Sequence, residues 1–179
     1  MPTITPAKAG VNLTELLAAK EARAQRQSSW LTHYAQPLVS MTLVTPGAVK
    51  DSSRYRRNMG IALQACDQLF WQHRWPVLAR KVLWLPTGPE ALWCIEHGAP
   101  EIKAATVALE TEHPLGRLWD IDVICPQSGL IGRRSLDEAG RRCLICDGPA
   151  HACARSRQHP IEQVVEKVEE IIDAWFTRD

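Results

Sequence analysis

The strongest candidate for a chemical site in this sequence is a pair of aspartates separated by one residue, Asp120 and Asp122 in the run LWDIDVI. In a β-strand, residues i and i+2 project from the same face, so both carboxylates would share one side while Trp119, Ile121 and Val123 pack on the other. Like charges held this close repel each other, and a divalent cation would remove the repulsion. Carboxylate oxygens suit Mg²⁺ or Mn²⁺, which are often bound together with substrate phosphates. The pair therefore predicts a metal site for phosphate chemistry, with a solvated Asp-x-Asp at a strand end as the alternative.

The residues just before this strand could bind a phosphate group. Gly116 would let a ligand approach the backbone closely, and the guanidinium of Arg117 can hold a phosphate through two parallel hydrogen bonds. Strict alternation would place Arg117 on the face opposite the aspartates unless the strand begins after it, so the direction of this side chain stays open. His113, at the start of the same segment, is a candidate general base because imidazole can accept a proton near neutral pH.

A second group of residues has the composition of a metal site. Cys143 and Cys146 form a Cys-x2-Cys pair, and Cys153 and His159 could complete a tetrahedral set, with His151 inside the same segment. Four protein ligands leave no open position on the metal, so zinc bound here would be structural. The alternative is a set of free thiols in an arginine-rich loop. The other cysteines are expected to be small core residues: Cys66, Cys94 and Cys125.

The elements that would position these groups follow from hydrophobic periodicity and turn residues. A helix that starts with the spacing of a capping box is predicted over residues 12–34. Residues 37–125 then follow the order strand, helix, strand, strand, helix, strand, which is typical of an α+β, ferredoxin-like βαββαβ core. A Cys/Arg-rich loop region over 126–159 precedes a C-terminal amphipathic helix over 160–176. We expect a single domain over 1–179.

Composition and charge argue against several classes of protein. The chain has 179 residues, is 45% hydrophobic and 23% charged, and has a formal net charge of +1. Binding to nucleic acid or to a membrane surface through overall charge is therefore not expected. No apolar run approaches the roughly 20 residues of a membrane span, and the N-terminus lacks the apolar core of a secretory signal. Because half of the cysteines crowd into Cys143–Cys153, a disulfide framework is not indicated and a cytoplasmic location is expected.

The balanced total hides an uneven distribution of charge. Residues 1–58 carry five more basic than acidic side chains, and residues 133–157 carry three more. Residues 59–132 and 158–179 are acidic, with excesses of three and four carboxylates. The basic blocks could face an anionic small molecule or an acidic protein, or they could be ordinary solvated surface.

Several runs of the sequence resemble one known family. The principal ones are HPLGRLWDIDV at 113–123 and RRCLICDGPAHACARSRQHPIEQVV at 141–165, supported by EARAQRQ at 21–27, PLVSMTLVTPGAVKDS at 37–52 and LPTGPEAL at 85–92. Together they are similar to the citrate lyase holo-acyl-carrier-protein synthase family, also called apo-citrate lyase phosphoribosyl-dephospho-CoA transferase. The resemblance extends over nearly the whole chain.

This resemblance implies a reaction and two partners. The family uses 2'-(5''-triphosphoribosyl)-3'-dephospho-CoA as donor, moves the phosphoribosyl-dephospho-CoA group to a serine of the apo acyl-carrier subunit of citrate lyase, and releases diphosphate. Such nucleotidyl transfer depends on positioning and charge neutralisation. Asp120 and Asp122 would then bind Mg²⁺, and Arg117 and Lys50 would contact phosphates. Arg23 and Arg26, which share a helix face, are the next candidates for phosphate contacts.

The chain departs from nucleotidyltransferases of the polymerase-β type in one respect. No Gly-Ser pair lies about ten residues before the Asp-x-Asp run, and the third acid that such enzymes carry has only loose candidates: Glu110, Glu112 and Asp51. The family's carrier subunits are generally acidic around the modified serine. We therefore expect the basic N-terminal third to dock the carrier through a group of arginines: Arg54, Arg56 and Arg57.

Two other functions compete with the transferase. One is a zinc-stabilised interaction module without catalysis, in which the arginine-rich residues 133–157 dock an acidic partner. The other is a zinc hydrolase or deaminase, but the sequence contains no His-x-Glu and so lacks the residue pattern of zinc deaminases.

Overall fold

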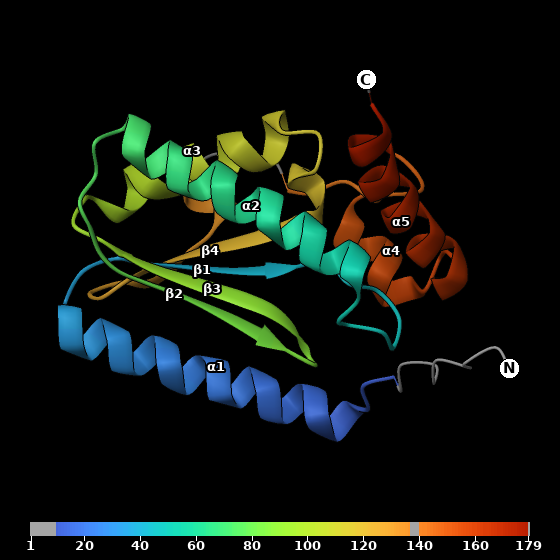
Figure 1. Ribbon diagram of the computed structural model, residues 1–179, viewed down its shortest axis with the longest axis horizontal. Helices are drawn as coiled ribbons and strands as arrows, with labels where there is room; N and C mark the ends of the chain where they lie inside the picture. Colours follow the sequence, from blue (N-terminus) through green and yellow to red (C-terminus); the bar gives the residue numbers. More distant parts are fainter. Residues whose placement is uncertain (1–9, 137–139, 179) are drawn as a thin grey trace, which may run out of the picture.

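The computed structural model describes residues 10–136 and 140–178, which form a mixed α/β structure around a five-stranded antiparallel sheet (Figure 1). The strands lie side by side in the order β2-β3-β1-β4-β5. They are β1 (Leu38–Leu43), β2 (Val77–Leu85), β3 (Gly88–Ile95), β4 (Trp119–Cys125) and β5 (Gly129–Ile131). The helices are α1 (Leu13–Tyr34), α2 (Ser53–Gln72), α3 (Ala99–Glu112), α4 (Ala150–Ser156) and α5 (Ile161–Thr177). None of the described helices combines the length and apolar character needed to cross a membrane.

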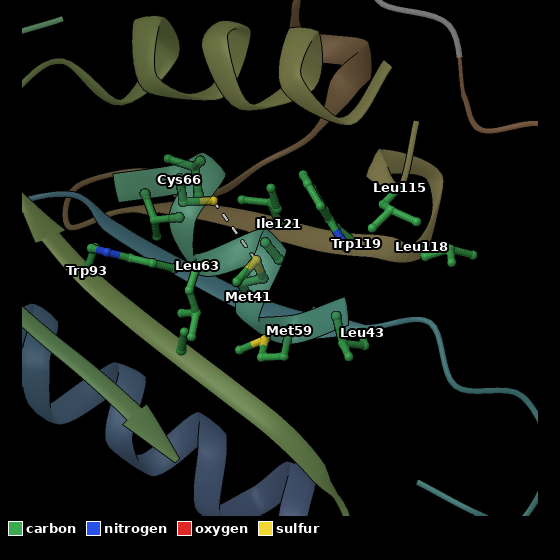
Figure 2. Close-up of a cluster of buried hydrophobic side chains, with 14 of the residues drawn as sticks. Met41, Leu43, Met59, Leu63, Cys66, Trp93, Leu115, Leu118, Trp119 and Ile121 are labelled. Atoms are coloured by element: carbon green, nitrogen blue, oxygen red, sulfur yellow. Dashed lines mark hydrogen bonds between the residues drawn. The ribbon is translucent and has the colours of Figure 1, made fainter. Parts of the chain in front are cut away.

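The hydrophobic core lies between one face of the sheet and helices α2 and α3 (Figure 2). Alternate residues of β4 point into it, so Trp119 and Ile121 are fully buried as the alternation predicts. Cys66 on α2 packs against Met41 on β1, with 4.0 Å between the two sulfur atoms. Because Cys66 and Cys94 are buried, the prediction that they are core residues is confirmed, whereas Cys125 is only partly buried.

Helix α1 covers the opposite face of the sheet (Figure 1) and is attached by polar contacts. The predicted capping box is present, since Asn12 and Glu15 each accept a hydrogen bond from the other's backbone N–H. No residue of α1 is itself buried, but it lies over Leu38 and Leu92 of the sheet, which are almost fully buried. The side chains of Arg23 and Arg26 also pair with Glu90 on β3. The sheet thus has one wholly apolar face and one face that mixes apolar and charged residues.

Two boundaries differ from the sequence prediction. A 3-10 turn at Gly116–Leu118 precedes β4, which begins only at Trp119, so Arg117 lies outside the strand and the alternation rule does not fix its direction. The region 126–159 was predicted as a loop, and this is wrong in part because it contains β5 and α4. Strand β5 forms a hairpin with the end of β4, and the alanine-rich run AHACARS has the composition of a helix.

Side chains close the part of the β4 edge that β5 does not reach. Glu110 on α3 accepts a hydrogen bond from the N–H of Ile121 at 2.9 Å, and Lys103 donates one to its carbonyl at 2.8 Å. Arg141 donates to the carbonyl of Trp119. The buried Glu110 carboxylate is neutralised in turn by Arg133 and Arg141. These contacts replace a missing strand and satisfy backbone groups that would otherwise be unpaired.

The close approach of the 3-10 turn to α3 leads to a prediction about Gly116. A methyl group at this position would lie 2.3 Å from the carbonyl oxygen of Glu110 and 2.7 Å from its Cα, so backbone would have to move. Gly116→Ala should lower the free energy of unfolding by about 2–3 kcal/mol, measured by urea denaturation. Gly60→Ala is the matched control, because nothing lies within 4 Å of that site in α2 and alanine favours a helix interior by about 0.5–1 kcal/mol. Equal stability of Gly116→Ala and wild type would contradict the packing argument.

Candidate functional site

The structure places Asp120 and Asp122 on the α1-facing side of the sheet. They pair across the ladder with Thr42 and Ser40 of β1, and Asp120 is exposed while Asp122 is half-buried. Burial raises the pKa of the Asp122 carboxyl, and the charge of Asp120 raises it further. Neither carboxylate forms an ion pair with another residue of the described chain. Two carboxylates held on one face of a strand are a donor set that fits a divalent metal ion.

A cavity of about 230 Å³ lies between α1 and the sheet, with Asp120 in its wall. Three cationic side chains, Lys20, Arg23 and Lys50, line it together with Glu90. Lys50 donates a hydrogen bond to the carbonyl of Thr45, and burial followed by the charge of Lys20 lowers the pKa of its ammonium group. This cavity therefore combines a carboxylate able to bind a metal with positive charge suited to an anion.

Lys20 and Glu90 belong to this cavity but were missed from the sequence. Lys20 precedes Arg23 by three residues and shares its helix face, a spacing that could have identified it. Glu90 opens the apolar run of β3, yet its side chain is only 4% exposed. Its carboxylate is held by Arg23 and by Arg26, whose own side chain does not line the cavity. Of Arg23 and Arg26, only Arg23 lines the cavity that contains Asp120.

A second cavity, of about 360 Å³, lies at the β4 edge and also contains Asp120 and Asp122. Its other charged wall residues are Lys103, Glu110, Arg133 and Arg141. Of the three acids considered as a third metal ligand, Glu110 lines this cavity, although its oxygens already accept from Ile121 and two arginines. The other two lie elsewhere: Glu112 is exposed at the end of α3, and Asp51 pairs with Arg56 at the start of α2.

The remaining phosphate and base candidates lie away from the aspartates. The ring of His113 packs between Trp119 and Trp175, at centroid distances of 4.4 and 4.7 Å, on the face of the sheet opposite Asp120. Its Nδ1 accepts a hydrogen bond from the N–H of Leu115, and burial lowers the pKa of the imidazole. Gly116 is buried against the backbone of Glu110. The structure thus gives His113 and Gly116 packing roles and does not bring either to the carboxylate pair.

Arg117 points toward the Cys/Arg-rich segment. Its Nε donates to the carbonyl of Arg142 at 2.9 Å. Burial and the charges of Arg141 and Arg133 lower the pKa of its guanidinium. Arg117 lines neither of the two aspartate cavities but a third hollow beside Cys143.

The four residues predicted to hold a second metal ion do converge. The ligand atoms of Cys143, Cys146, Cys153 and His159 all lie within 4.8 Å of one another. Backbone N–H groups of Cys146 and Ile145 lower the pKa of Cys143 to about 6, whereas hydrogen bonding to the Cys146 sulfur raises the pKa of Cys153 to about 12. His159 has a buried Nε2 without a hydrogen-bond partner. Crowded sulfur atoms and an unpaired imidazole nitrogen are what a metal ion would satisfy, so this Cys3His cluster could hold one.

The arginines expected to dock a carrier protein each contact another residue of the chain. Arg54 pairs with Asp173 on α5 at 2.9 Å, and Arg56 pairs with Asp51 at 2.7 Å. The guanidinium of Arg57 lies 3.9 Å from the ring centre of Phe176. Two of the three charges are therefore balanced within the chain, and Arg54 and Arg57 connect α2 to α5. Their role in docking stays a prediction.

The raised pKa of Asp122 predicts that this residue reduces stability. The folded state binds the Asp122 proton more tightly than the unfolded state does, so ionisation costs stability as the pH rises from about 3.8 through the folded pKa. The cost is complete once the pH is above the folded pKa. Asp122→Asn removes it and should raise Tm at pH 7, measured without divalent cations, while Glu112→Gln, at an exposed site, should leave Tm unchanged. A lower Tm for Asp122→Asn would show that its carboxylate is stabilising.

Comparison with known proteins assigns the chain to a family. A family model described as apo-citrate lyase phosphoribosyl-dephospho-CoA transferase matches residues 11–175. A protein of that name from Citrobacter koseri is 39% identical over 162 residues, which cover 90% of this chain and 88% of the relative. Its counterpart from Shigella flexneri serotype 5b is 38% identical over 163 residues, covering 91% of this chain and 89% of the relative. The match includes both the aspartate strand and the Cys3His segment, and the chain therefore belongs to the apo-citrate lyase phosphoribosyl-dephospho-CoA transferase family.

Proposed function

We propose that this chain transfers a phosphoribosyl-dephospho-CoA group to a serine of the apo acyl-carrier subunit of citrate lyase. The group that is moved and the protein that receives it are those in the names of its relatives. The observation that supports this function most is the cavity where Asp120 faces Lys20, Arg23 and Lys50. Its charges suit a polyphosphate, and the donor in this proposal is 2'-(5''-triphosphoribosyl)-3'-dephospho-CoA.

The reaction is a single displacement at the α-phosphorus of the donor. The serine Oγ of the carrier forms a bond to that phosphorus, the bond to the bridging oxygen breaks, and diphosphate leaves with the electron pair. The serine proton passes to a base or to solvent. Lys20, Arg23 and Lys50 bind the triphosphate and stabilise the charge that develops on the departing diphosphate. His113 lies on the other face of the sheet and is not placed to act as this base.

We infer that Asp120 and Asp122 bind Mg²⁺. The carboxylates share one face of β4 and lack an ion-pair partner among the described residues, and burial followed by the charge of Asp120 raises the pKa of Asp122. When bound there, the ion would neutralise phosphate charge and orient the triphosphate. The carboxylates hold this position because Ile121, between them, is anchored in the core.

We infer that the Cys3His cluster binds a structural Zn²⁺. Tetrahedral zinc with bonds of about 2.0–2.3 Å places its ligand atoms about 3.3–3.8 Å apart, and the sulfurs of Cys146 and Cys153 are 3.5 Å apart. All four positions would be filled by protein, which leaves zinc no place for substrate. Its role would be to fix the turn between Arg142 and Pro149, which form a β-bridge.

We also infer that the core has the ferredoxin-like fold within a single domain. The support is the chain order β1-α2-β2-β3-α3-β4 together with the antiparallel strand order β2-β3-β1-β4. A cytoplasmic location fits the same proposal, because a Cys3His metal site needs thiolates, which a reducing compartment maintains.

The transferase proposal predicts the effect of removing one carboxylate charge. Asp120→Asn should lower kcat for diphosphate release by about 100-fold or more, which corresponds to about 2.7 kcal/mol of lost transition-state stabilisation. Diphosphate release is measured with purified apo-carrier, the triphosphate donor and Mg²⁺. Glu112→Gln removes a charge without changing the size of the side chain, at an exposed site at the end of α3, and should retain wild-type turnover. Equal turnover of both variants would remove Asp120 from the proposed site.

The zinc assignment predicts a joint loss of metal and stability. Protein purified without added metal should contain one zinc per chain by elemental analysis, and Cys153→Ser should contain much less. Because metal binding contributes folding free energy, Cys153→Ser should also have a lower Tm. Cys94→Ser, at a cysteine outside the cluster, is the control and should keep its zinc. A wild-type protein free of zinc would contradict the assignment.

A further inference from the structure

A third hollow, separate from the two aspartate cavities, lies beside the Cys3His cluster. It has a volume of about 730 Å³. Val44 and Pro46, which follow β1, form one wall, and Cys143 and Leu144 form another. Ile161 and Val164, from the start of α5, form the third. This volume is within the usual range for sites that bind small molecules.

The walls contributed by α5 are apolar surface that the fold leaves uncovered. The sequence predicts one continuous apolar face for this helix, and its later residues Val168 and Ile172 are fully buried. At the start of the same helix Ile161 remains 50% exposed and Val164 is only half-buried. The apolar face thus continues out of the core and into the hollow, where a ligand could cover it.

Two arginines bring positive charge to the hollow. Arg117 and Arg157 both line it, and neither forms an ion pair with a carboxylate within residues 10–136 and 140–178. The Nε of Arg117 donates to the carbonyl of Arg142. The like charges of Arg141 and Arg133 act on the same guanidinium. A phosphate group would relieve this repulsion through bidentate hydrogen bonds.

We propose that the hollow binds the dephospho-CoA portion of the donor, with the methylene and methyl groups of its pantetheine arm on α5 and its diphosphate at Arg117 and Arg157. This inference rests on the proposed function. Pantetheine joins apolar methylene and methyl groups to a few amides and a hydroxyl, and the hollow offers apolar and cationic surface side by side. Ala150 lines both the hollow and the cavity at the β4 edge, and Asp120 lines both that cavity and the one that holds Lys20, Arg23 and Lys50. The three spaces therefore adjoin, and one donor molecule can extend through them.

The test measures binding of dephospho-CoA itself to the full chain by titration calorimetry. Val164→Trp fills the hollow and should weaken binding about tenfold or more, whereas Gln163→Trp, at the adjacent exposed position, should bind within about twofold of wild type. Arg157→Asn removes the charge at a site with a φ of 50°, which asparagine tolerates, and should also weaken binding. Arg155→Asn, on the same helix but outside the hollow, is its control.

The outcomes separate this inference from the proposed function. Wild-type binding by Val164→Trp and Arg157→Asn would overturn the hollow as the dephospho-CoA site, even if the chain modifies its carrier. Loss of binding in both variants, with no carrier modification by wild type, would support the hollow and contradict the transferase. A raised KM for carrier in Val164→Trp, with dephospho-CoA binding unchanged, would identify the hollow as a carrier-docking surface and overturn the proposal.

Discussion

The buried carboxylate of Glu110 is the interaction on which the arrangement of the site depends. It accepts the backbone N–H of Ile121, and it pairs with Arg133 and Arg141 from the segment that follows the sheet. Removing one partner of a buried ion pair costs about 3–5 kcal/mol because the other charge is left uncompensated. One side chain therefore fixes the free edge of β4, the helix α3 and the start of the Cys/Arg-rich segment. Because Ile121 lies between Asp120 and Asp122, the contacts that hold Ile121 also fix the positions of both aspartates.

The α1-facing side of the sheet is held by a different mix of contacts from the core. Apolar burial joins α2 and α3 to the sheet, whereas α1 lies over buried Leu38 and Leu92 and adds polar contacts, those of Glu90 with two arginines and of Gln27 with Ser40. Polar attachment leaves space for the cavity in which Asp120 faces lysines and an arginine. In such a site the carboxylates repel one another, and so do the cationic side chains. A metal ion and a polyphosphate would relieve both repulsions together. The residues that would bind the ligands therefore lower the stability of the free protein.

Local sequence patterns predicted much of this structure but not its long-range charge pairing. Strict alternation in LWDIDVI identified the buried and open faces of β4, and the Cys-x2-Cys run identified the Cys3His cluster. Glu90 was missed because a carboxylate at the start of an apolar strand is explained only by Arg23 and Arg26, more than sixty residues earlier. His113 and Gly116 are polar or flexible residues near the aspartates in sequence, yet the 3-10 turn directs them into packing contacts. Proximity along the chain could not reveal which face each would occupy.

The proposed function of this chain is to attach phosphoribosyl-dephospho-CoA to a carrier serine. The most direct measurement is the intact mass of purified apo acyl-carrier subunit after incubation with the full chain, the triphosphate donor and Mg²⁺. We expect a mass increase equal to the donor minus diphosphate, located on one serine, and lost when EDTA removes the metal. An unchanged carrier mass in the presence of folded chain, donor and Mg²⁺ would exclude this function.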